Sequence, residues 1–503
     1  MNLSVKKVVV AGGGTIGYIA AAALRRTFRH ADLEVVVVDT PERGAPAARW
    51  TLPSQRGAHA QIGLSEADFL RETDATYRLA SELSGWQRPA SFLLAHAEIG
   101  SPIEVTPFYK LLLASELRGN PENAEMYSVG AGAARLGRFA RPMGSGNELT
   151  AGFTYGYHLD ERAYARLLRT LSAKAGVQSI AGRIADVGLR ENGHVDSLVL
   201  DGGQQVAGDL FVDCTGAAAA IFSRLDAGPR VDWARWLPCD RIVSALIPTV
   251  GDPPALTRLL GTEAGWVFHA PLATKAFVGH VYSSAHMNDE TALATLCNAV
   301  RVPSVEPEVT SFAAGRRERS WVGNCIALGA AAMEIEPLAG ANLHFAQIGL
   351  AKLLELFPIG GRDAGESFEF NRIVGEYADS LRDFTLATYR LSPRPGPFWD
   401  ATRAADLPAS LSTKLDLYAA SGRIDTRDHE IFEEHDWAWL FLGSGFRPRA
   451  LEWQVARAVS GVKREQVNQL RDQVGRLVTS MPRHMEYLQR VKTTPPRAPG
   501  ANA

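Results

Sequence analysis

A glycine-rich turn near the N-terminus is the first feature that could do chemistry. Gly12, Gly14 and Gly17 have the spacing Gly-x-Gly-x-x-Gly between an apolar run and an alanine-rich segment. In that setting the first glycine permits a tight turn, the second lets backbone approach a diphosphate, and the third lets a helix pack closely on a strand. Asp39 ends the next apolar run, where a carboxylate can accept hydrogen bonds from ribose hydroxyls. The pattern predicts a dinucleotide site and does not separate FAD from NAD.

A second turn of small residues follows a predicted strand much later in the chain, at Asp213-Cys214-Thr215-Gly216. Backbone could approach the dinucleotide here as well. A simple NAD-binding domain does not need a second cofactor-binding segment so far along the chain, so Asp213 and Gly216 favour FAD. An ordinary strand-to-helix turn is the alternative.

Metal and hydrolase chemistry lack comparable patterns. The four cysteines form no Cys-x-x-Cys pair, and the histidines show neither His-x-x-x-His nor His-Glu-x-x-His spacing. The Gly-x-Ser-x-Gly motif of many hydrolases is missing from the sequence. We therefore predict no metal site and no disulfide framework.

The elements that must position the first glycine turn form one strand–helix–strand unit. Residues 8–11 and 33–38 are continuous apolar runs typical of buried parallel strands, and residues 18–28 have helical spacing. Such a unit predicts a right-handed crossover and a parallel sheet.

The rest of the chain alternates between loops, strands and helices. The pattern predicts a long loop over 41–61, a helix over 64–86, loops with short helices over about 100–156, and a helix over 157–173. Strands are expected over 180–212 and 241–284, and helices beyond about 345.

An apolar stripe lies near the C-terminus, where residues 467, 470, 474, 477 and 481 are spaced three and four apart. This spacing predicts a helix packed on its own protein, and a homodimer seam is the alternative. Residues 493–503 have no apolar pattern and are expected to be a disordered tail.

The composition is that of a soluble globular protein. Hydrophobic residues make up 46% and charged residues 21% of the 503 positions, and the formal net charge is -2. This balance argues against a nucleic-acid binder that relies on a large positive field. No run approaches the roughly 20 apolar residues that a membrane helix needs, and the N-terminus does not resemble a signal peptide. We expect a cytoplasmic protein.

Several segments, taken in order, resemble the flavin-dependent tryptophan halogenase family over nearly the whole chain. They are AGGGTIGYIAAAAL (11–24), YHLDERAYARLL (157–168), GDLFVDCTG (208–216), LPCDRIVSALIP (237–248), GWVFHAPL (265–272), GHVYSS (279–284), WVGNCIALGAAAMEIEPLAGANLHF (321–345), FNRIVGEYADSLRDFTLATY (370–389) and WAWLFLGSGFRP (437–448).

The resemblance implies an α/β fold: a Rossmann-like FAD-binding domain with a parallel sheet and a second antiparallel sheet, plus a mainly helical C-terminal module. We expect the FAD-binding domain over 1–390, with a loop and helix insertion at about 87–156, and the helical substrate-side module over 391–492. Reduced FAD, delivered by a separate flavin reductase through diffusion, would react with oxygen and oxidise a halide ion to hypohalous acid. The acid would pass through a tunnel to a small, electron-rich aromatic substrate.

The resemblance also implies a set of site residues. Glu336 corresponds to the catalytic glutamate, ahead of Glu334, and Arg78 stands at the position of the catalytic lysine. The halide would be held by the backbone of Ala341 and Asn342. The implied cofactor-binding residues are Gly12, Gly14, Thr15, Ile16, Gly17, Asp39, Asp213, Gly216, Trp266, Gly329 and Leu338.

The chain departs from the family in the residues that handle the halogen. Arg78 is permanently protonated and a poor nucleophile compared with lysine. Phe268 replaces the second tryptophan of the family's Trp-x-Trp-x-Ile-Pro motif, and the family's Ser-Thr-Gly is Gly340-Ala341-Asn342 here, without a hydroxyl. The family's Gly-Glu-Ala-Thr stretch, expected near 52–56, has no clear match.

These departures leave several hypotheses open. The first is a halogenase that acts on an indole or another electron-rich aromatic. The second is a flavin monooxygenase that hydroxylates, which Arg78, Phe268 and Ala341 would favour. A flavin-binding or substrate-binding homologue without catalysis is the third, and a nicotinamide-dependent dehydrogenase is the weakest. Structural roles also remain open: Glu336 as a salt-bridge partner, and Arg78 as a solvated charge on a helix.

Overall fold

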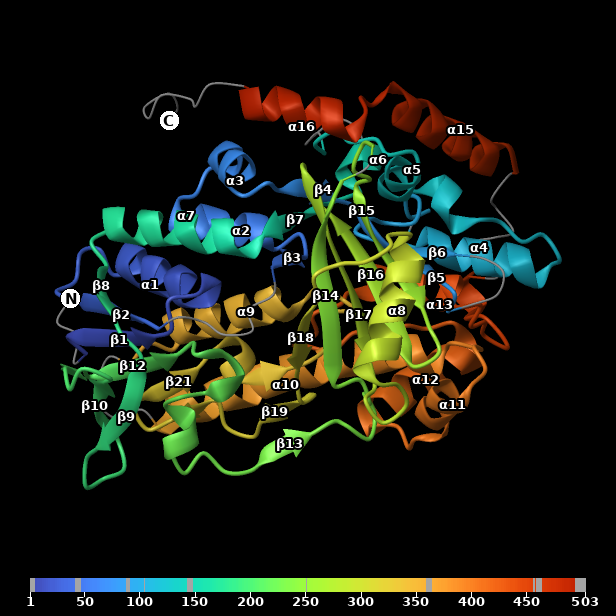
Figure 1. The fold of residues 1–503 in the computed structure, drawn as a ribbon. Coiled ribbons are helices and arrows are strands. Elements are labelled where there is room, and N and C mark those ends of the chain that lie inside the picture. Colours follow the sequence, from blue (N-terminus) through green and yellow to red (C-terminus); the bar gives the residue numbers. More distant parts are fainter. Residues whose placement is uncertain are drawn as a thin grey trace. The chain divides into compact units, whose positions relative to one another are not determined.

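The computed structural model describes residues 5–40, 47–86, 91–103, 105–142, 148–249, 251–358, 364–455, 457 and 464–493 (Figure 1). The chain forms two compact units, and each is assembled from three stretches of sequence. Unit 1 contains Met1–Asp74, Leu159–Ala234 and Thr310–Asp379; unit 2 contains Ala75–His158, Arg235–Val309 and Ser380–Ala503. The predicted division of the chain at residue 390 differs from this one and stays a prediction.

Unit 1 is organised around a six-stranded sheet with the order β20-β21-β12-β1-β2-β8. All neighbours are parallel except β20 and β21. The strands are β1 (Lys7–Ala11), β2 (Glu34–Asp39), β8 (Gln178–Ala181), β12 (Leu210–Asp213), β20 (Trp321–Val322) and β21 (Cys325–Ala327). Val8, Val9 and Val10 are fully buried, as expected for a parallel strand covered on both faces.

Helices of unit 1 pack around α1, which lies beside the parallel sheet (Figure 1). The alanines at 20–23 of α1 are all buried, and their small side chains let α1 approach α2, α7, α9 and β2 closely. The helices are α1 (Thr15–Thr27), α2 (Gln55–Ile62), α7 (Glu161–Lys174) and α9 (Asn342–Glu355), and α3 (Glu66–Glu72) packs on α7.

Short strands and turns complete unit 1. One three-stranded sheet contains β9 (Ile184–Leu189), β10 (Val195–Leu200) and β11 (Gln205–Ala207). Another contains β13 (Arg230–Asp232), β19 (Gly315–Arg317) and β22 (Met333–Glu334). The remaining elements are β3 (Ala48–Trp50), η2 (Gly216–Ala218), η3 (Phe222–Arg224) and η4 (Gly329–Ala331).

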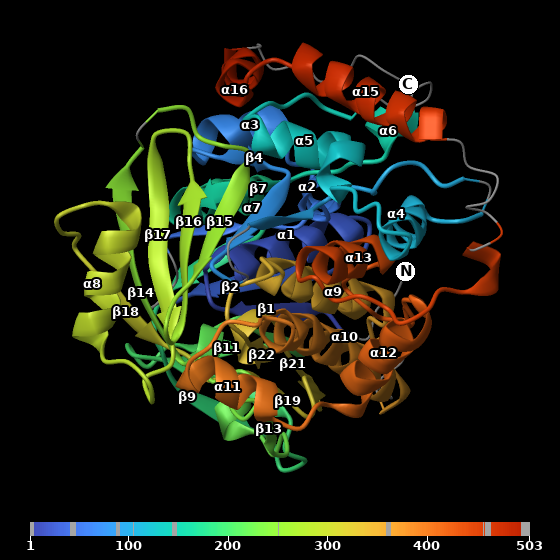
Figure 2. The same ribbon diagram turned by 90° about the vertical axis from the view of Figure 1, so that its right-hand side faces the viewer.

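Unit 2 contains most of a seven-stranded, mainly antiparallel sheet with the order β18-β14-β17-β16-β15-β5-β6. From β14 to β6, the β15–β5 pair is parallel and the other neighbours are antiparallel. Figure 2 shows the long strands of this sheet with α8 against them, and α8 contacts β14, β16 and β17. The elements are β5 (Ala80–Ser84), β6 (Phe92–Ala95), β14 (Arg241–Pro248), β15 (Leu256–Gly261), β16 (Gly265–Pro271), β17 (Lys275–Tyr282) and α8 (Asp289–Val300).

The other elements of unit 2 are mostly helices. They are β4 (Thr76–Arg78), α4 (Phe108–Leu117), η1 (Ala124–Tyr127), α5 (Val129–Arg135), α6 (Glu148–Ala151), α11 (Pro397–Ala404), α12 (Ala409–Ser421), α13 (Glu434–Gly443), α15 (Arg464–Ser480) and α16 (His484–Thr493). Three of the five points where the chain passes between the units lie within an element: β7 (Gly156–Asp160), β18 (Glu308–Ser311) and α10 (Ala364–Arg390).

Most large features of the sequence prediction are confirmed. The first strand–helix–strand unit, the parallel and antiparallel sheets and the helical part beyond residue 345 are all present. Four residues of the C-terminal stripe (467, 470, 474 and 477) lie on α15, which packs on α5, and Met481 follows the end of that helix; Val474 and Met481 are buried. Its packing on its own protein is therefore confirmed. The predicted tail lies outside the described residues from 494 on, and Thr493 ends α16.

Three local predictions were wrong. The helix predicted over 64–86 is only α3, because Asp74 has a left-handed φ of 50° and the chain continues as β4 and β5. The helix predicted over 157–173 starts after strand β7, where the Asp160 side chain accepts a hydrogen bond from the Ala163 amide and caps α7. The loop predicted over 41–61 contains β3 and nearly all of α2; its residues 41–46 lie outside the described part.

Within the described ranges, no helix has both the length and the apolar composition needed to cross a membrane. In the same part of the chain, His, Cys, Asp and Glu side chains form no cluster that could hold a metal ion.

Buried neutral histidines predict a dependence of stability on pH. In unit 2, Nδ1 of His280 lies 3.0 Å from the Ala292 carbonyl oxygen, Nε2 lies 2.9 Å from the Thr262 hydroxyl, and burial lowers the pKa of His280 to about 4. Between pH 6.5 and 4 the unfolded chain therefore binds a proton that the folded chain does not, and the free energy of unfolding falls as the pH drops. For His280 the fall from pH 6.5 to 5 is about 2 kcal/mol.

The measurement is chemical denaturation between pH 7 and 5. We expect His280→Gln to make the loss of stability with falling pH shallower than in the wild type. The exposed His30 provides the matched control, because His30→Gln should leave the slope unchanged. Equal slopes for wild type and His280→Gln would contradict the prediction.

Candidate active site

The glycine turn after β1 is closely packed in unit 1. Gly12 has a φ of 105°, and a Cβ built there would lie 2.4 Å from the carbonyl oxygen of Cys214. A Cβ on Gly17 would lie 1.9 Å from the Gly12 carbonyl oxygen. Both positions therefore require glycine, for the turn and for close packing, as the sequence predicts. Gly14 precedes α1 as its N-cap residue.

The start of α1 fits an anionic group. Gly14 offers no side chain to cap the helix, so the amides of the first turn point away from the helix without a side-chain acceptor. Thr15 is 2% exposed, and no described residue supplies a hydrogen-bond partner for its hydroxyl. A diphosphate would satisfy these donors, because the helix N-terminus carries a partial positive charge.

Asp39 lies at the end of β2, as predicted. It accepts a hydrogen bond of 2.9 Å from the Tyr18 hydroxyl, and it lies 3.2 Å from the exposed Arg169. Burial raises the pKa of the Tyr18 phenol, which therefore stays a donor to the carboxylate. The sequence analysis overlooked Gly13: a Cβ there would lie 1.8 Å from Asp39 Oδ1. Three consecutive glycines were the signal that could have identified it.

Asp213 shapes the second turn. Its Oδ1 accepts hydrogen bonds from the amide and hydroxyl of Thr215, and its Oδ2 accepts from the amides of Ile221 and Phe222. The carboxylate is fully buried. It therefore holds the loop in which Gly216, with a φ of 73° and open space around a Cβ position, presents its backbone.

The third segment predicted to bind the cofactor, at Gly329, lies beside the turns at Gly12 and Gly216. Gly329 follows β21, and a Cβ there would lie 2.4 Å from Cδ1 of Ile16 in α1. Because β1, β12 and β21 are neighbouring parallel strands, the turns after all three meet at the carboxyl edge of the sheet. Ligands of open α/β sheets bind at this edge. Residues from three distant stretches of sequence thus fit an FAD site.

A tight loop of residues 335–342 follows β22 in unit 1. Gly340 donates its amide to the Pro337 carbonyl at 2.9 Å, and the Asn342 side chain donates to the Ile335 carbonyl at 2.9 Å. Glu336 is 2% exposed, and Leu338 is fully buried. We call residues 335–342 the glutamate loop.

The two glutamates of this region have different surroundings. Glu334 accepts a hydrogen bond of 3.2 Å from the Arg230 guanidinium, and burial raises the pKa of this carboxyl. Glu334 therefore serves the small sheet of β13, β19 and β22, whereas Glu336 lies inside the glutamate loop. This arrangement supports Glu336 over Glu334 as the functional carboxylate.

The end of the glutamate loop starts helix α9. Ala341 is its N-cap residue, and it provides no side-chain cap. The side chain of Asn342 is engaged with Ile335, so its contribution to an anion would come from the backbone amide. The predicted halide positions, Ala341 and Asn342, thus lie at the positive end of a helix of 14 residues.

Arg78 lies in β4 of unit 2, and its expected alternative as a solvated helix charge is wrong. The side chain is 1% exposed. Its guanidinium donates to the Thr257 hydroxyl at 2.9 Å, to the Ser81 hydroxyl at 2.6 Å and to Nε2 of His96. Burial lowers the pKa of Arg78 to about 9, so it remains a cation at neutral pH.

A chain of hydrogen bonds continues from Arg78. Thr76 donates its hydroxyl to the Pro271 carbonyl at 2.6 Å and therefore accepts from Nδ1 of His158. Burial holds the pKa of His158 well below its usual value, so its Nε2 is an acceptor for the Thr257 hydroxyl at 2.9 Å. Thr257 in turn accepts from Arg78. The network determines which atom of each hydrogen-bonded pair is the donor. It also fixes the orientation of the guanidinium.

Trp266 and Phe268 lie on β16 in unit 2. Both are buried, with ring centroids 6.1 Å apart. A Cβ on Gly279 would lie 2.4 Å from the Phe268 ring, so the neighbouring strand makes room for this phenylalanine. The role of Trp266 in cofactor binding stays a prediction.

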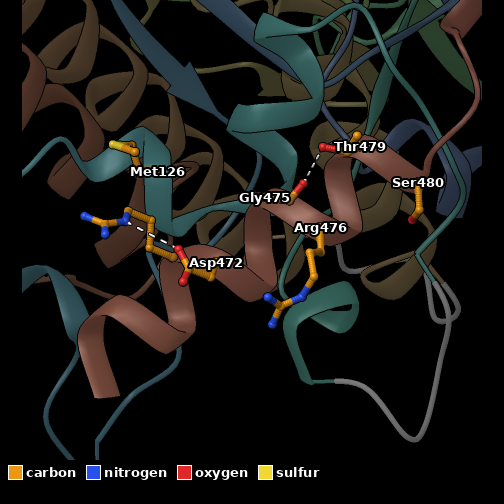
Figure 3. A pocket seen from close by; sticks show the side chains of 7 residues that line it. Met126, Asp472, Gly475, Arg476, Thr479 and Ser480 are labelled. Carbon is orange, nitrogen blue, oxygen red and sulfur yellow. Dashed lines mark hydrogen bonds and ion pairs between the residues drawn. The ribbon is translucent and has the colours of Figure 1, made fainter. Parts of the chain in front are cut away.

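A surface hollow along α15 contains none of the predicted site residues (Figure 3). Its lining comes mainly from the polar face of α15, including Asp472, Arg476 and Thr479, with Met126 of η1 opposite. We assign it no function.

Comparison with known proteins identifies the family. The family model described as tryptophan halogenase matches residues 7–460. This chain belongs to the tryptophan halogenase family. The chain is 27% identical to the tryptophan 6-halogenase ThaL of Streptomyces albogriseolus, over 89% of this chain and 91% of that protein. It is also 27% identical to the tryptophan 7-halogenase RebH of Lentzea aerocolonigenes, over 84% of each.

Solved structures agree with this membership. BrvH, a flavin-dependent halogenase from Brevundimonas sp. BAL3, has a TM-score of 0.91 and 31% identity, with 97% of this chain and 99% of that chain covered. Xcc4156, a flavin-dependent halogenase from Xanthomonas campestris, has a TM-score of 0.91 and 32% identity, with 98% and 99% covered. The predicted family and fold class are confirmed, and the chain is an enzyme of the flavin-dependent halogenase type.

The packing at Gly13 predicts a loss of FAD binding on substitution. Gly13→Ala should displace Asp39 and weaken FAD binding at least about tenfold, or ~1.4 kcal/mol. The measurement is titration of the purified protein with FAD, followed by flavin fluorescence. Gly57→Ala is the matched control, because a Cβ on Gly57 of α2 has nothing within 4 Å. Unchanged FAD affinity in a folded Gly13→Ala protein would contradict the assignment.

Proposed function

We propose that this enzyme is an FAD-dependent halogenase that acts on an indole or another electron-rich, tryptophan-like aromatic. The observation that carries the proposal is the glutamate loop. It contains a buried carboxylate, Glu336, and it ends at the uncapped N-terminus of helix α9, in the same unit as the glycine turn after β1. A base for an aromatic ring proton and a binding place for a halide would thereby belong to one short loop.

The residues that would hold FAD belong to unit 1. Gly12, Gly14 and Gly17 together with Thr15 would bind the diphosphate, and Asp39 would bind the ribose. The turns at Gly216 and Gly329 would bind nearer the flavin. When bound in its reduced form, FAD supplies the reaction with oxygen that oxidises the halide. A separate flavin reductase would provide the reduced cofactor by diffusion.

Glu336 would act on the substrate. Attack of an electrophilic halogen on an aromatic ring creates a positive charge on the ring, and the ring must then lose a proton. A buried carboxylate stabilises that charge and accepts the proton, and its low-dielectric surroundings strengthen the interaction. The halide would be held by the amides of Ala341 and Asn342, where the dipole of α9 favours an anion.

Arg78 would act as a fixed hydrogen-bond donor. The network through Thr257 and His96 holds its guanidinium rigidly, and a protonated guanidinium does not attack hypohalous acid as an amine does. Arg78 can therefore orient hypohalous acid by donating hydrogen bonds, without forming a covalent haloamine.

The protonated guanidinium at the position of the catalytic lysine also favours a second candidate, a monooxygenase that hydroxylates the aromatic substrate. The deciding experiment supplies the enzyme with FAD, a flavin reductase, NADH, oxygen, bromide and indole. Mass spectrometry distinguishes a brominated product, with its paired isotope peaks, from a product that has gained one oxygen atom. A brominated product is expected; hydroxyindole alone would select the monooxygenase.

The aromatic substrate's identity, a homodimer and a cytoplasmic location stay predictions.

The role of Glu336 predicts a specific loss of activity. Glu336→Gln should lower the bromination rate of indole at least about a hundredfold, because the amide cannot accept the ring proton. FAD binding should be unchanged. Glu334→Gln is the matched control: it removes the charge paired with Arg230 and should mainly lower stability. The assignment would be wrong if the two variants lost activity equally.

The buried position of Arg78 predicts a gain from lysine. Arg78→Lys would place an amine near Ser81 and Thr257, and burial would favour the uncharged form that captures hypohalous acid. We expect a several-fold higher bromination rate, measured as bromoindole formed per enzyme. The control is Arg258→Lys, at a mostly exposed arginine of β15, which should not change the rate. An unchanged rate for a folded Arg78→Lys enzyme would contradict the equivalence of Arg78 to the catalytic lysine.

A further inference from the structure

The two carboxylate oxygens of Asp39 have different surroundings in unit 1. Oδ2 accepts a hydrogen bond of 2.9 Å from the Tyr18 hydroxyl and lies 3.2 Å from Nη1 of Arg169. Oδ1 lies against the glycine turn after β1, since a Cβ built on Gly13 would be 1.8 Å from it. Among the described residues, none donates a hydrogen bond to Oδ1. The side chain of Asp39 is 19% exposed, so a ligand can reach the carboxylate.

Tyr18 is held in place from both ends. Its backbone carbonyl accepts a hydrogen bond of 3.1 Å from the hydroxyl of Ser172 in α7. Its own hydroxyl donates to Asp39, and it therefore accepts from the Ser179 hydroxyl of β8, which lies 3.3 Å away. Tyr18 as a whole is 2% exposed. Burial raises the pKa of the phenol, so the hydroxyl keeps its proton and stays a donor.

Two donors on one oxygen fix the orientation of the Asp39 carboxylate. Rotation of the carboxylate would break the bond to the Tyr18 hydroxyl and the ion pair with Arg169 together, and hydrogen bonds to charged groups are the strong ones. Oδ1 therefore stays beside the glycine turn as an acceptor for a ligand. In a dinucleotide the adenosine ribose is joined directly to the diphosphate. A diphosphate bound at this turn would thus bring the ribose hydroxyls close to Asp39.

We infer that Tyr18 and Arg169 are positioning residues that reserve Oδ1 of Asp39 for a hydroxyl of the adenosine ribose of FAD. Tyr18 contributes more than Arg169, because the Arg169 side chain is 58% exposed, and water and salt weaken an exposed ion pair. The ligand class is a dinucleotide with free ribose hydroxyls. This inference rests on the FAD site of the proposed function and deepens it.

The central experiment compares two ligands, FAD and an FAD analogue whose adenosine ribose lacks the 2′- and 3′-hydroxyls. Their dissociation constants are measured by titration followed by flavin fluorescence, so no turnover is needed. Wild type should bind the analogue about tenfold more weakly than FAD, the loss typical of one hydrogen bond to a charged group. Asp39→Ala should bind the two ligands with nearly equal affinity, because it has no carboxylate to accept from the ribose.

Tyr18→Phe tests the positioning role. It keeps the aromatic ring of α1 and removes only the hydroxyl that binds Oδ2 of Asp39. The carboxylate can then turn, and the preference for FAD over the analogue should fall from about tenfold to about threefold. Tyr164→Phe is the matched control and should keep the wild-type preference, since Tyr164 is another buried tyrosine of unit 1, with a hydroxyl that accepts from Gln55.

Arg169→Gln tests the second donor at an exposed position, where a substitution does not disturb the core. The preference for FAD over the analogue should fall about twofold at low salt, and the difference from wild type should shrink at high salt as the ion pair is screened. Both ligands carry the same diphosphate, so the ratio cancels the effect of salt on that group. Arg166→Gln, at an exposed arginine of the same helix, is the control and should match wild type.

The outcomes separate the positioning role from the FAD site itself. An unchanged preference in folded Tyr18→Phe, together with a lost preference in Asp39→Ala, would refute the positioning role and leave the FAD site standing. A structural effect alone would weaken the binding of both ligands by the same factor and would also refute it, as would an equal fall in Tyr164→Phe. A wild type that binds FAD without any preference over the analogue would overturn ribose recognition by Asp39. A wild type that binds no flavin would overturn the proposed function.

Discussion

Backbone amides at two uncapped helix ends are the interaction on which unit 1 depends. Helix α1 begins after Gly14 and helix α9 begins after Ala341, and neither residue has a side chain that caps the amides. Such ends are stabilised by anions. The parallel sheet places the turns after β1, β12 and β21 together, and the glutamate loop leads directly into α9. The same feature, an uncapped helix N-terminus, would thus serve both the proposed diphosphate site and the proposed halide site.

Unit 2 contains a buried cation, Arg78, whose charge must be stabilised away from water. Arg78 lies among hydroxyls and neutral imidazoles, and the order of donors from Arg78 through Thr257 and His158 to Thr76 leaves a single consistent arrangement. Repulsion from Arg78 adds to burial in lowering the pKa of His158 and of His96. The network therefore maintains the conditions that make its own histidines acceptors.

The sequence predicts those parts of the site that local spacing determines. The glycine turn, Asp39 and the turn at Asp213 follow from motifs, and the structure places them at one edge of the sheet. The preference for Glu336 over Glu334 follows from the family resemblance and stays a prediction. Contacts between distant residues could not be predicted. The Ser179 hydroxyl that bonds to Tyr18 lies 161 positions away in the chain, and no motif marks it. The strand of Arg78 was missed because Ala75–Leu79 has apolar residues that fit a helix, while the left-handed turn at Asp74 ends one.

The interleaved order of the units constrains how the chain can fold during synthesis. β1 is made first and pairs early with β2, but its other neighbour, β12, follows some two hundred residues later, and β21 lies beyond residue 324. Stretches of unit 2 separate these pieces. Such long-range pairing is slow and leaves unpaired strand edges exposed in the meantime. A truncated chain that stops before β21 therefore lacks the strand that pairs with β12 on the side away from β1. In a nascent chain, this edge of β12 stays unpaired and prone to aggregation until β21 has been synthesised.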